Sequence, residues 1–251
     1  MIGNILSVFS ILLNLCIIPT GWLVYKKKLK FLSGVFLGTF LFLVSFGCSV
    51  YGTHLVYGYS PIDHMINTYF DSIASVYGSI GGVTEDQLLA FNNINTALKE
   101  YYFTFMPSLV VTTALGCSYI IIMLFKGILA LFKKDISNFD RFCDLRMPKS
   151  ALFFAIIAHG LSFVFDSERL GYAFLNFGSI IFTLVAVCGL SVIDYGLRKK
   201  IRFSILRTFI YIIVFGILTL FMGIGTSLLT FIGMFDSFFN IREIKIKFHK
   251  S

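Results

Sequence analysis

Charged residues are scarce in this chain of 251 residues, making up 14% of the sequence against 57% for apolar residues. A soluble domain usually devotes about a quarter of its residues to charge, because its surface faces water. The charges that do occur form short basic clusters between apolar runs of about 20 residues, a pattern typical of charge flanking membrane helices. The composition therefore excludes an ordinary soluble domain. Despite the net charge of +8, we expect a lipid bilayer and not a nucleic acid as the partner.

Motifs of catalysis and metal binding are also missing. The chain has no CxxC pair, no HExxH, no GxSxG and no glycine-rich phosphate loop. Four of the five scattered cysteines lie in apolar runs, where cysteine behaves as a small hydrophobic residue. No carboxylate lies in the middle of an apolar run, which argues against a proton pump. We therefore expect no enzyme activity, no metal and no cofactor.

The apolar runs predict an all-α fold, a polytopic transmembrane helix bundle that forms a single membrane domain over residues 1–251. A helix of about 20 apolar residues crosses the hydrocarbon of a bilayer. The first run lacks the basic start and the cleavage site of a signal peptide, so we expect a retained span there. About seven spans are expected: 2–25, 31–57, 103–126, 151–165, 170–195, and two short helices formed by a break of 205–235 near Gly223.

The basic loop 133–149 sets the predicted orientation, because positive residues accumulate on the cytoplasmic side of membrane proteins. With seven spans, all of the 21 Lys and Arg residues except Lys99 and Arg169 lie on the side of this loop. A single helix over 205–235 would instead move the basic C-terminal tail to the other side. We therefore expect the N-terminus outside and the C-terminus inside.

One polar insertion, residues 58–102, predicts two amphipathic helices on the outer side. Ser60 and Pro61 are typical of a helix start, and Thr84 with Gln87 forms a capping box before the second helix. The second helix is expected to run on into the third span. The predicted apolar face of the first helix holds Ile62, Met65, Ile66, Tyr69, Phe70, Ile73 and Tyr77.

Polar side chains within the spans are the candidate ligand contacts. Asn14 lies midway along the first span, and His159 and Asn176 lie in the outer half of the hairpin 151–195. They could line an outward-facing pocket. Alternatively each forms a hydrogen bond between helices, worth about 0.6 kcal/mol on average. Because Ser162 follows His159 at helical spacing, a serine–histidine hydrolase is a further alternative, although no orienting group accompanies the pair.

Two pairs of small residues predict close helix contacts. Gly34 and Gly38 have the GxxxG spacing, and Ala151 and Ala155 repeat it with alanine after Pro148. The glycine pair is also compatible with ordinary glycine use in a membrane helix. The alanine pair could dock a partner helix or pack against a neighbour in the same chain.

Three passages carry a family resemblance. The first is Asn138-Phe139 with Leu145-Arg146-Met147-Pro148, and the second is Cys188–Ile193 with its G-L-S-V-I order. The third is Gly233–Arg242 with its Gly, Asp236 and Arg242. Together they resemble the YybS-like family of bacterial membrane proteins of unknown function. Asn240 replaces the usual acid of the closing signature. The resemblance covers about 107–242. The first half is expected to match only in hydropathy and to be shorter at its N-terminus than typical members.

The resemblance implies a bacterial cytoplasmic membrane and no established activity. It also implies a broad likeness to the substrate-capture (S) components of energy-coupling-factor vitamin transporters, which is an analogy of fold alone. For Asp236 and Arg242 we expect a charge pair that fixes a helix end, the alternative being two independent solvated charges.

Two functions follow as hypotheses. The first is a non-enzymatic subunit that captures a small molecule from outside, with 58–102 as a lid over a pocket near Asn176 and His159. The second is a structural or regulatory scaffold that docks a membrane or peripheral protein. Its candidate contacts at the cytoplasmic helix ends are Arg146, Pro148, Ala151, Ala155, Asp236 and Arg242.

Overall fold

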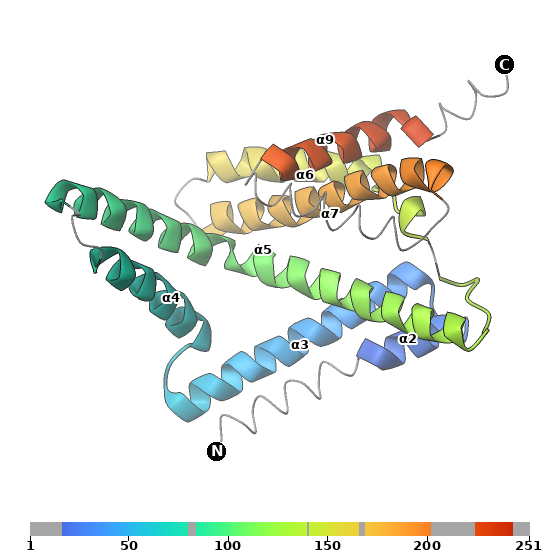
Figure 1. The fold of residues 1–251 in the computed structure, drawn as a ribbon, viewed down its shortest axis with the longest axis horizontal. Coiled ribbons are helices and arrows are strands. Elements are labelled where there is room, and N and C mark those ends of the chain that lie inside the picture. Colours follow the sequence, from blue (N-terminus) through green and yellow to red (C-terminus); the bar gives the residue numbers. More distant parts are fainter. Residues whose placement is uncertain (1–16, 80–83, 140, 166–168, 202–223, 243–251) are drawn as a thin grey trace. The chain divides into compact units, whose positions relative to one another are not determined.

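The computed structural model describes residues 17–79, 84–139, 141–165, 169–201 and 224–242, and these are organised as helices without a strand (Figure 1). Three helices are long and apolar enough to cross a membrane: α3 (Phe31–Tyr57), α5 (Glu85–Leu131) and α7 (Arg169–Lys200). The predicted all-α membrane fold is confirmed. The count of seven spans stays a prediction, because most of the first span and of 205–223 lies outside the described residues.

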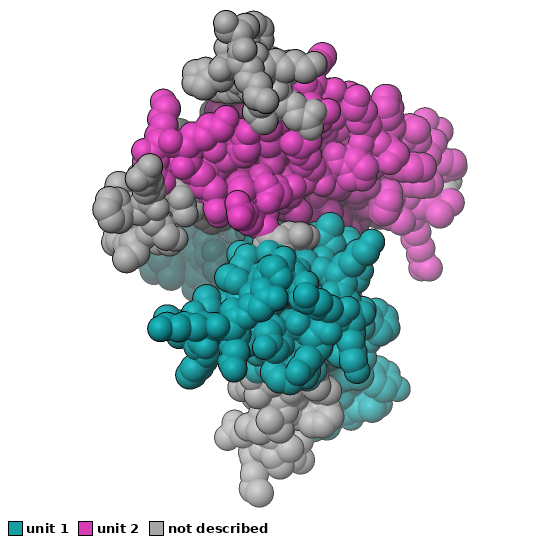
Figure 2. Space-filling model, turned by 90° about the vertical axis from the view of Figure 1, so that its right-hand side faces the viewer, with its two compact units in different colours: residues 1–139 teal, residues 140–251 magenta. Residues whose placement is uncertain are grey.

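The chain divides into two compact units, residues 1–139 and 140–251, which are coloured separately in Figure 2. The single membrane domain over 1–251 stays a prediction. Large apolar side chains remain exposed on both units, among them Phe36 at 60%, Leu131 at 82% and Phe163 at 79%. Such exposure would be unfavourable in water and is expected where lipid covers the helices.

In unit 1, α2 (Ile17–Tyr25), α3 and α5 pack around a core. A Cβ added to Gly34 on α3 would lie 2.5 Å from a methyl group of Val24 on α2. The glycine therefore permits a close approach of two helices within the chain, as its spacing predicts. The buried members of this core are Val24, Phe31, Val35, Ile122, Leu129 and Phe139.

The polar insertion forms the helices expected from its sequence. α4 (Pro61–Gly78) begins after Ser60, whose hydroxyl accepts a hydrogen bond from the Asp63 amide at 3.4 Å. Both hydrogen bonds of the predicted capping box, between Thr84 and Gln87, are present at 3.1 and 3.4 Å. The second amphipathic segment and the third span form one helix, α5, whose 47 residues extend about 70 Å.

The predicted apolar face of α4 is only partly correct. Ile66 and Phe70 are buried, but Met65 and Tyr69 are each 59% exposed. α4 packs mainly along α5, so a narrow stripe of its surface is covered and the flanks of the predicted face are not. Along that stripe, Tyr77 stacks on Phe91 of α5 with ring centroids 4.0 Å apart.

Unit 2 contains a short 3₁₀ turn, η1 (Phe142–Asp144), and the helices α6 (Lys149–Val164), α7 and α9 (Ile224–Phe239). α7 packs along both α6 and α9 (Figure 1). Added Cβ atoms at Gly189 on α7 and Gly233 on α9 would lie 2.0 Å from the Leu229 carbonyl oxygen and 2.1 Å from the Val185 carbonyl oxygen. The two helix backbones therefore touch at these glycines, and residues at either side are brought together.

Candidate functional site

A buried ion pair lies at the end of α9. The Asp236 carboxylate and the Arg242 guanidinium approach to 2.9 Å, and both side chains are 2% exposed. Between them Asn240 has a positive φ of 49°, a left-handed conformation that asparagine tolerates just after a helix. The chain can therefore turn back and bring Arg242 to Asp236. The predicted charge pair is confirmed, and the alternative of two solvated charges is wrong.

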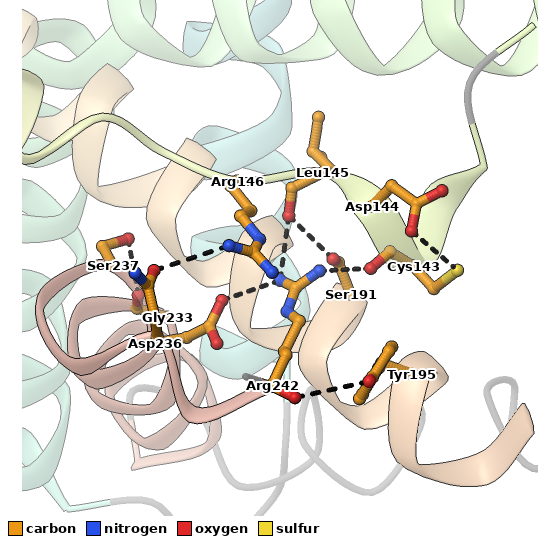
Figure 3. A network of polar contacts seen from close by, with 11 residues as sticks. Cys143, Asp144, Leu145, Arg146, Ser191, Tyr195, Gly233, Asp236, Ser237 and Arg242 are labelled. Carbon is orange, nitrogen blue, oxygen red and sulfur yellow. Dashed lines mark hydrogen bonds and ion pairs between the residues drawn. The ribbon is translucent and has the colours of Figure 1, made fainter. Parts of the chain in front are cut away.

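Arg242 also holds the segment that precedes α6. Its guanidinium donates to the backbone carbonyl of Cys143 and, at 2.9 Å, to that of Leu145 (Figure 3). The Ser191 hydroxyl on α7 donates to the same Leu145 carbonyl at 2.9 Å. Carbonyl groups in irregular backbone need such donors when they leave water. We call Asp236, Arg242 and the two carbonyls the Arg242 clamp, which holds η1 and Leu145 at the end of α9, while Ser191 adds the contact to α7.

The surroundings of the clamp suit a structural fastener better than a reaction centre. Asp236 Oδ1 and Arg242 Nε are buried without a hydrogen-bond partner among the described residues, and the other polar atoms of the two side chains are used in the ion pair and in the bonds to the Cys143 and Leu145 carbonyls. Tyr195 donates to the Arg242 carbonyl at 3.3 Å, and Arg146 donates to Asn240 Oδ1 at 3.5 Å. Each contact ties the end of α9 to another segment of unit 2.

The Cys143 thiol lies inside this cluster. It donates to the Asp144 carboxylate at 3.5 Å, and the residue is 5% exposed. Burial raises the pKa of the Cys143 thiol above its ordinary value, and the positive charge of Arg198 opposes part of that rise. The thiol is therefore held in its protonated, weakly nucleophilic form.

The other predicted helix-end residues occupy different environments. Pro148 is the N-cap of α6, and Arg146 is exposed. Ala151 is half-buried, whereas Ala155 is 0% exposed and packs against α7 in the core of unit 2. Ala155 thus offers no surface to another protein. Contact of the remaining residues with a partner stays a prediction.

A cavity of about 440 Å³ lies among α6, α7 and α9, close to one of the predicted pocket residues. Its volume falls in the range of small-molecule sites, about 300–1,000 Å³. His159 enters it from α6, and hydroxyl and aromatic side chains surround the imidazole. The described lining residues are His159, Ser179, Phe182, Thr183, Ala186, Ser227, Thr230, Phe231 and Met234, and none of them carries a formal charge.

The His159 ring is held by α7. A Cβ added at Gly178 would lie 2.1 Å from His159 Nδ1, so the ring edge rests directly on the glycine. Nδ1 is buried without a hydrogen-bond partner among the described residues, and the ring meets Phe182 edge-on at 4.9 Å. Ser162 donates to the His159 backbone carbonyl at 2.7 Å, so that hydroxyl is directed at the backbone and not at the imidazole.

The three predicted pocket residues do not form one set. His159 lines the cavity. Asn176 is 8% exposed, donates to the Tyr172 carbonyl at 2.8 Å within α7, and is not among the lining residues. Asn14 lies outside the described residues.

Sequence reasoning missed the hydroxyl groups of this cavity. Ser179 and Thr183 lie four residues apart on α7 and therefore share a face, a signal visible in the sequence. Their hydroxyls donate to carbonyls one turn back, Ser179 to Leu175 at 2.8 Å and Thr183 to Ser179 at 2.9 Å. Each hydroxyl consequently keeps acceptor lone pairs for a ligand.

Comparison with known proteins places the chain beside a family of membrane proteins. The model of a family described as "Predicted membrane protein (DUF2232)" matches residues 1–237, so the similarity extends through the first half as well as over 107–242. No curated protein and no solved structure matches the chain.

Proposed function

The chain belongs to the DUF2232 family of predicted membrane proteins, and on that premise we propose that it is a non-enzymatic subunit that binds an uncharged small molecule in the α6–α7–α9 cavity. The observation that carries the proposal is the lining: hydroxyls and an imidazole gathered around open space between apolar helices. The Ser179 and Thr183 hydroxyls donate within α7 but keep acceptor lone pairs, which a bound ligand with hydrogen-bond donors would satisfy.

The lining also narrows the class of ligand. A charged ligand would find no opposite charge among the described lining residues, and burying it unpaired would be unfavourable. Ser179 and Thr183 present acceptor lone pairs, which favours a ligand with N–H or O–H donors. Phe182 and Phe231 suit an aromatic or other flat apolar body. The ligand expected is therefore a neutral, partly aromatic molecule with hydrogen-bond donors.

The proposal includes a place in the cell. The protein lies in a bacterial cytoplasmic membrane with the N-terminus outside, where its ligand is captured for transport. The sequence resemblance to YybS-like proteins supports the bacterial membrane, and the expected likeness to transporter S components supports ligand capture by analogy of fold alone. The lid role of 58–102 and the alternative of a protein-docking scaffold stay predictions.

Ligand retention tests the proposal. The full chain is purified in mild detergent, exposed to pools of vitamins, nucleobases and lipids, and analysed by native mass spectrometry and thermal shift. We expect one neutral ligand per chain. Ala186→Phe fills the cavity and should abolish retention, whereas Ala173→Phe, on an exposed position of the same helix, should not. Absence of any retained ligand, or equal retention by both variants, would overturn the assignment.

A further inference from the structure

A second cavity lies at the basic end of α7, and it shares no lining residue with the α6–α7–α9 cavity. Its volume is about 350 Å³. The C-terminal part of α7 and the two residues after Asn240 surround it. The described lining residues are Val192, Ile193, Tyr195, Gly196, Leu197, Lys199, Lys200, Ile241 and Arg242.

The lining divides into an apolar part and a cationic part. Val192, Ile193, Leu197 and Ile241 supply apolar surface, and Lys199 and Lys200 supply ammonium groups. Both lysines are exposed, and the Lys199 ammonium lies 4.7 Å from the centre of the Tyr195 ring. No carboxylate pairs with either lysine among the described residues. The groove therefore presents unneutralised positive charge beside hydrocarbon-like surface.

The neighbouring arginines are already occupied. Arg242 is paired with Asp236 and bonded to two carbonyls, and Arg198 donates to Asp194 at 2.8 Å. The charge available to a ligand thus comes from the two lysines. Since α7 is long and apolar enough to span a bilayer, its basic last turn is expected at the level of the lipid headgroups.

We propose that this groove binds an anionic phospholipid, with the headgroup phosphate at Lys199 and Lys200 and an acyl chain along Val192, Ile193 and Leu197. Charge complementarity selects the headgroup, and basic pockets at the ends of membrane helices are suited to such lipids. The alternative role of the lysines, favourable interaction with the negative end of the helix dipole, requires no groove and no particular headgroup. Filling the groove without changing its charge should therefore weaken lipid binding if the lysines bind a headgroup, and should have no effect if they only interact with the helix dipole.

Gly196 provides that charge-neutral change. It lines the groove, and an added Cβ there would meet no atom within 4 Å, so a larger side chain can enter the space. Gly196→Leu should fill the groove and leave both lysines in place. Gly160→Leu, on α6 at a position that is also open, is the matched control.

The test uses the full chain in nanodiscs or mild detergent with phosphatidylglycerol, phosphatidylcholine or glycerol phosphate, analysed by native mass spectrometry. We expect one retained phosphatidylglycerol per chain and neither of the other two. Replacing Lys199 and Lys200 by glutamine should weaken retention about fivefold per lysine. Gly196→Leu should weaken it comparably.

Controls separate a built site from general surface charge. The pair Lys133→Gln and Lys134→Gln removes the same charge at exposed positions after α5 and should leave retention unchanged. The proposal is overturned if this pair loses retention equally, if phosphatidylcholine is retained, or if glycerol phosphate alone is bound. It is also overturned if Gly160→Leu has an effect equal to that of Gly196→Leu. Because these lipids are charged and the other cavity is proposed for a neutral ligand, failure here leaves the proposed function intact.

Discussion

Breaking the Arg242 clamp should destabilise unit 2 far more than breaking an exposed ion pair. In Arg242→Met the Asp236 carboxyl group stays buried at 2% exposure but loses its partner, and the Cys143 carbonyl loses its donor. Removing one member of a buried pair usually costs about 3–5 kcal/mol. Asp236→Leu leaves the guanidinium buried in the same way and should cost a similar amount.

The double variant gives the sharper measurement. Once both charges are replaced, no unpaired charge remains buried, and the desolvation cost of the pair disappears. We expect the double variant to be at least about 2 kcal/mol more stable than the sum of the single effects implies. Asp71→Asn is the control, because Asp71 pairs with Lys99 at 3.8 Å in an exposed position and such pairs contribute about 0–1 kcal/mol.

The measurement is unfolding by SDS titration in mixed micelles, followed by circular dichroism, combined with alkylation of Cys143. Because the clamp holds the Cys143 carbonyl, Arg242→Met should also expose the neighbouring thiol, whereas Asp71→Asn should not. The stabilising role of the buried ion pair would be refuted if the single variants were no more destabilising than Asp71→Asn. Strictly additive effects of the Asp236 and Arg242 replacements would refute it as well.

Three further outcomes follow from the described contacts. Gly233→Ala should lower the free energy of unfolding by about 1–3 kcal/mol in the same assay, because its Cβ would lie 2.1 Å from the Val185 carbonyl oxygen. Gly196→Ala, whose Cβ would meet no atom within 4 Å, should be neutral or stabilising. Equal effects of the two variants would contradict the close contact of α7 and α9. Thr84→Ala should destabilise the start of α5 by about 1 kcal/mol, measured as faster amide hydrogen exchange of residues 86–88. The control variant Ser72→Ala should leave the exchange of these residues unchanged. Unchanged exchange in Thr84→Ala would show that the capping box contributes nothing. Burial raises the pKa of the Cys143 thiol in the folded state, so its contribution to the free energy of unfolding is lost as pH rises from the unfolded-state pKa through the folded-state pKa. Alkylation of Cys143 at pH 8 should therefore be slower in the folded chain than in SDS by about tenfold or more. Equal rates would argue against a buried thiol.

Local features were predictable because they depend on neighbours in sequence. The capping box of Thr84 and Gln87, the start of α4 at Pro61 and the continuous helix into the third span all follow from spacing, and the structure confirms them. The membrane class followed equally directly, since apolar runs of this length leave few alternatives to transmembrane helices. Even so, which flank of α4 is covered depended on α5, and Met65 and Tyr69 are exposed for that reason.

The candidate site required tertiary structure. The sequence placed Asp236 and Arg242 near each other and predicted their pairing, but the carbonyls that Arg242 holds lie almost one hundred residues earlier in the chain. Likewise His159 was a candidate from its polarity alone, whereas Ser179 and Thr183 became its neighbours only through the packing of α6, α7 and α9. Periodicity reveals what one helix buries; which helices meet, and what space is left between them, is decided by close contacts such as those at Gly189 and Gly233.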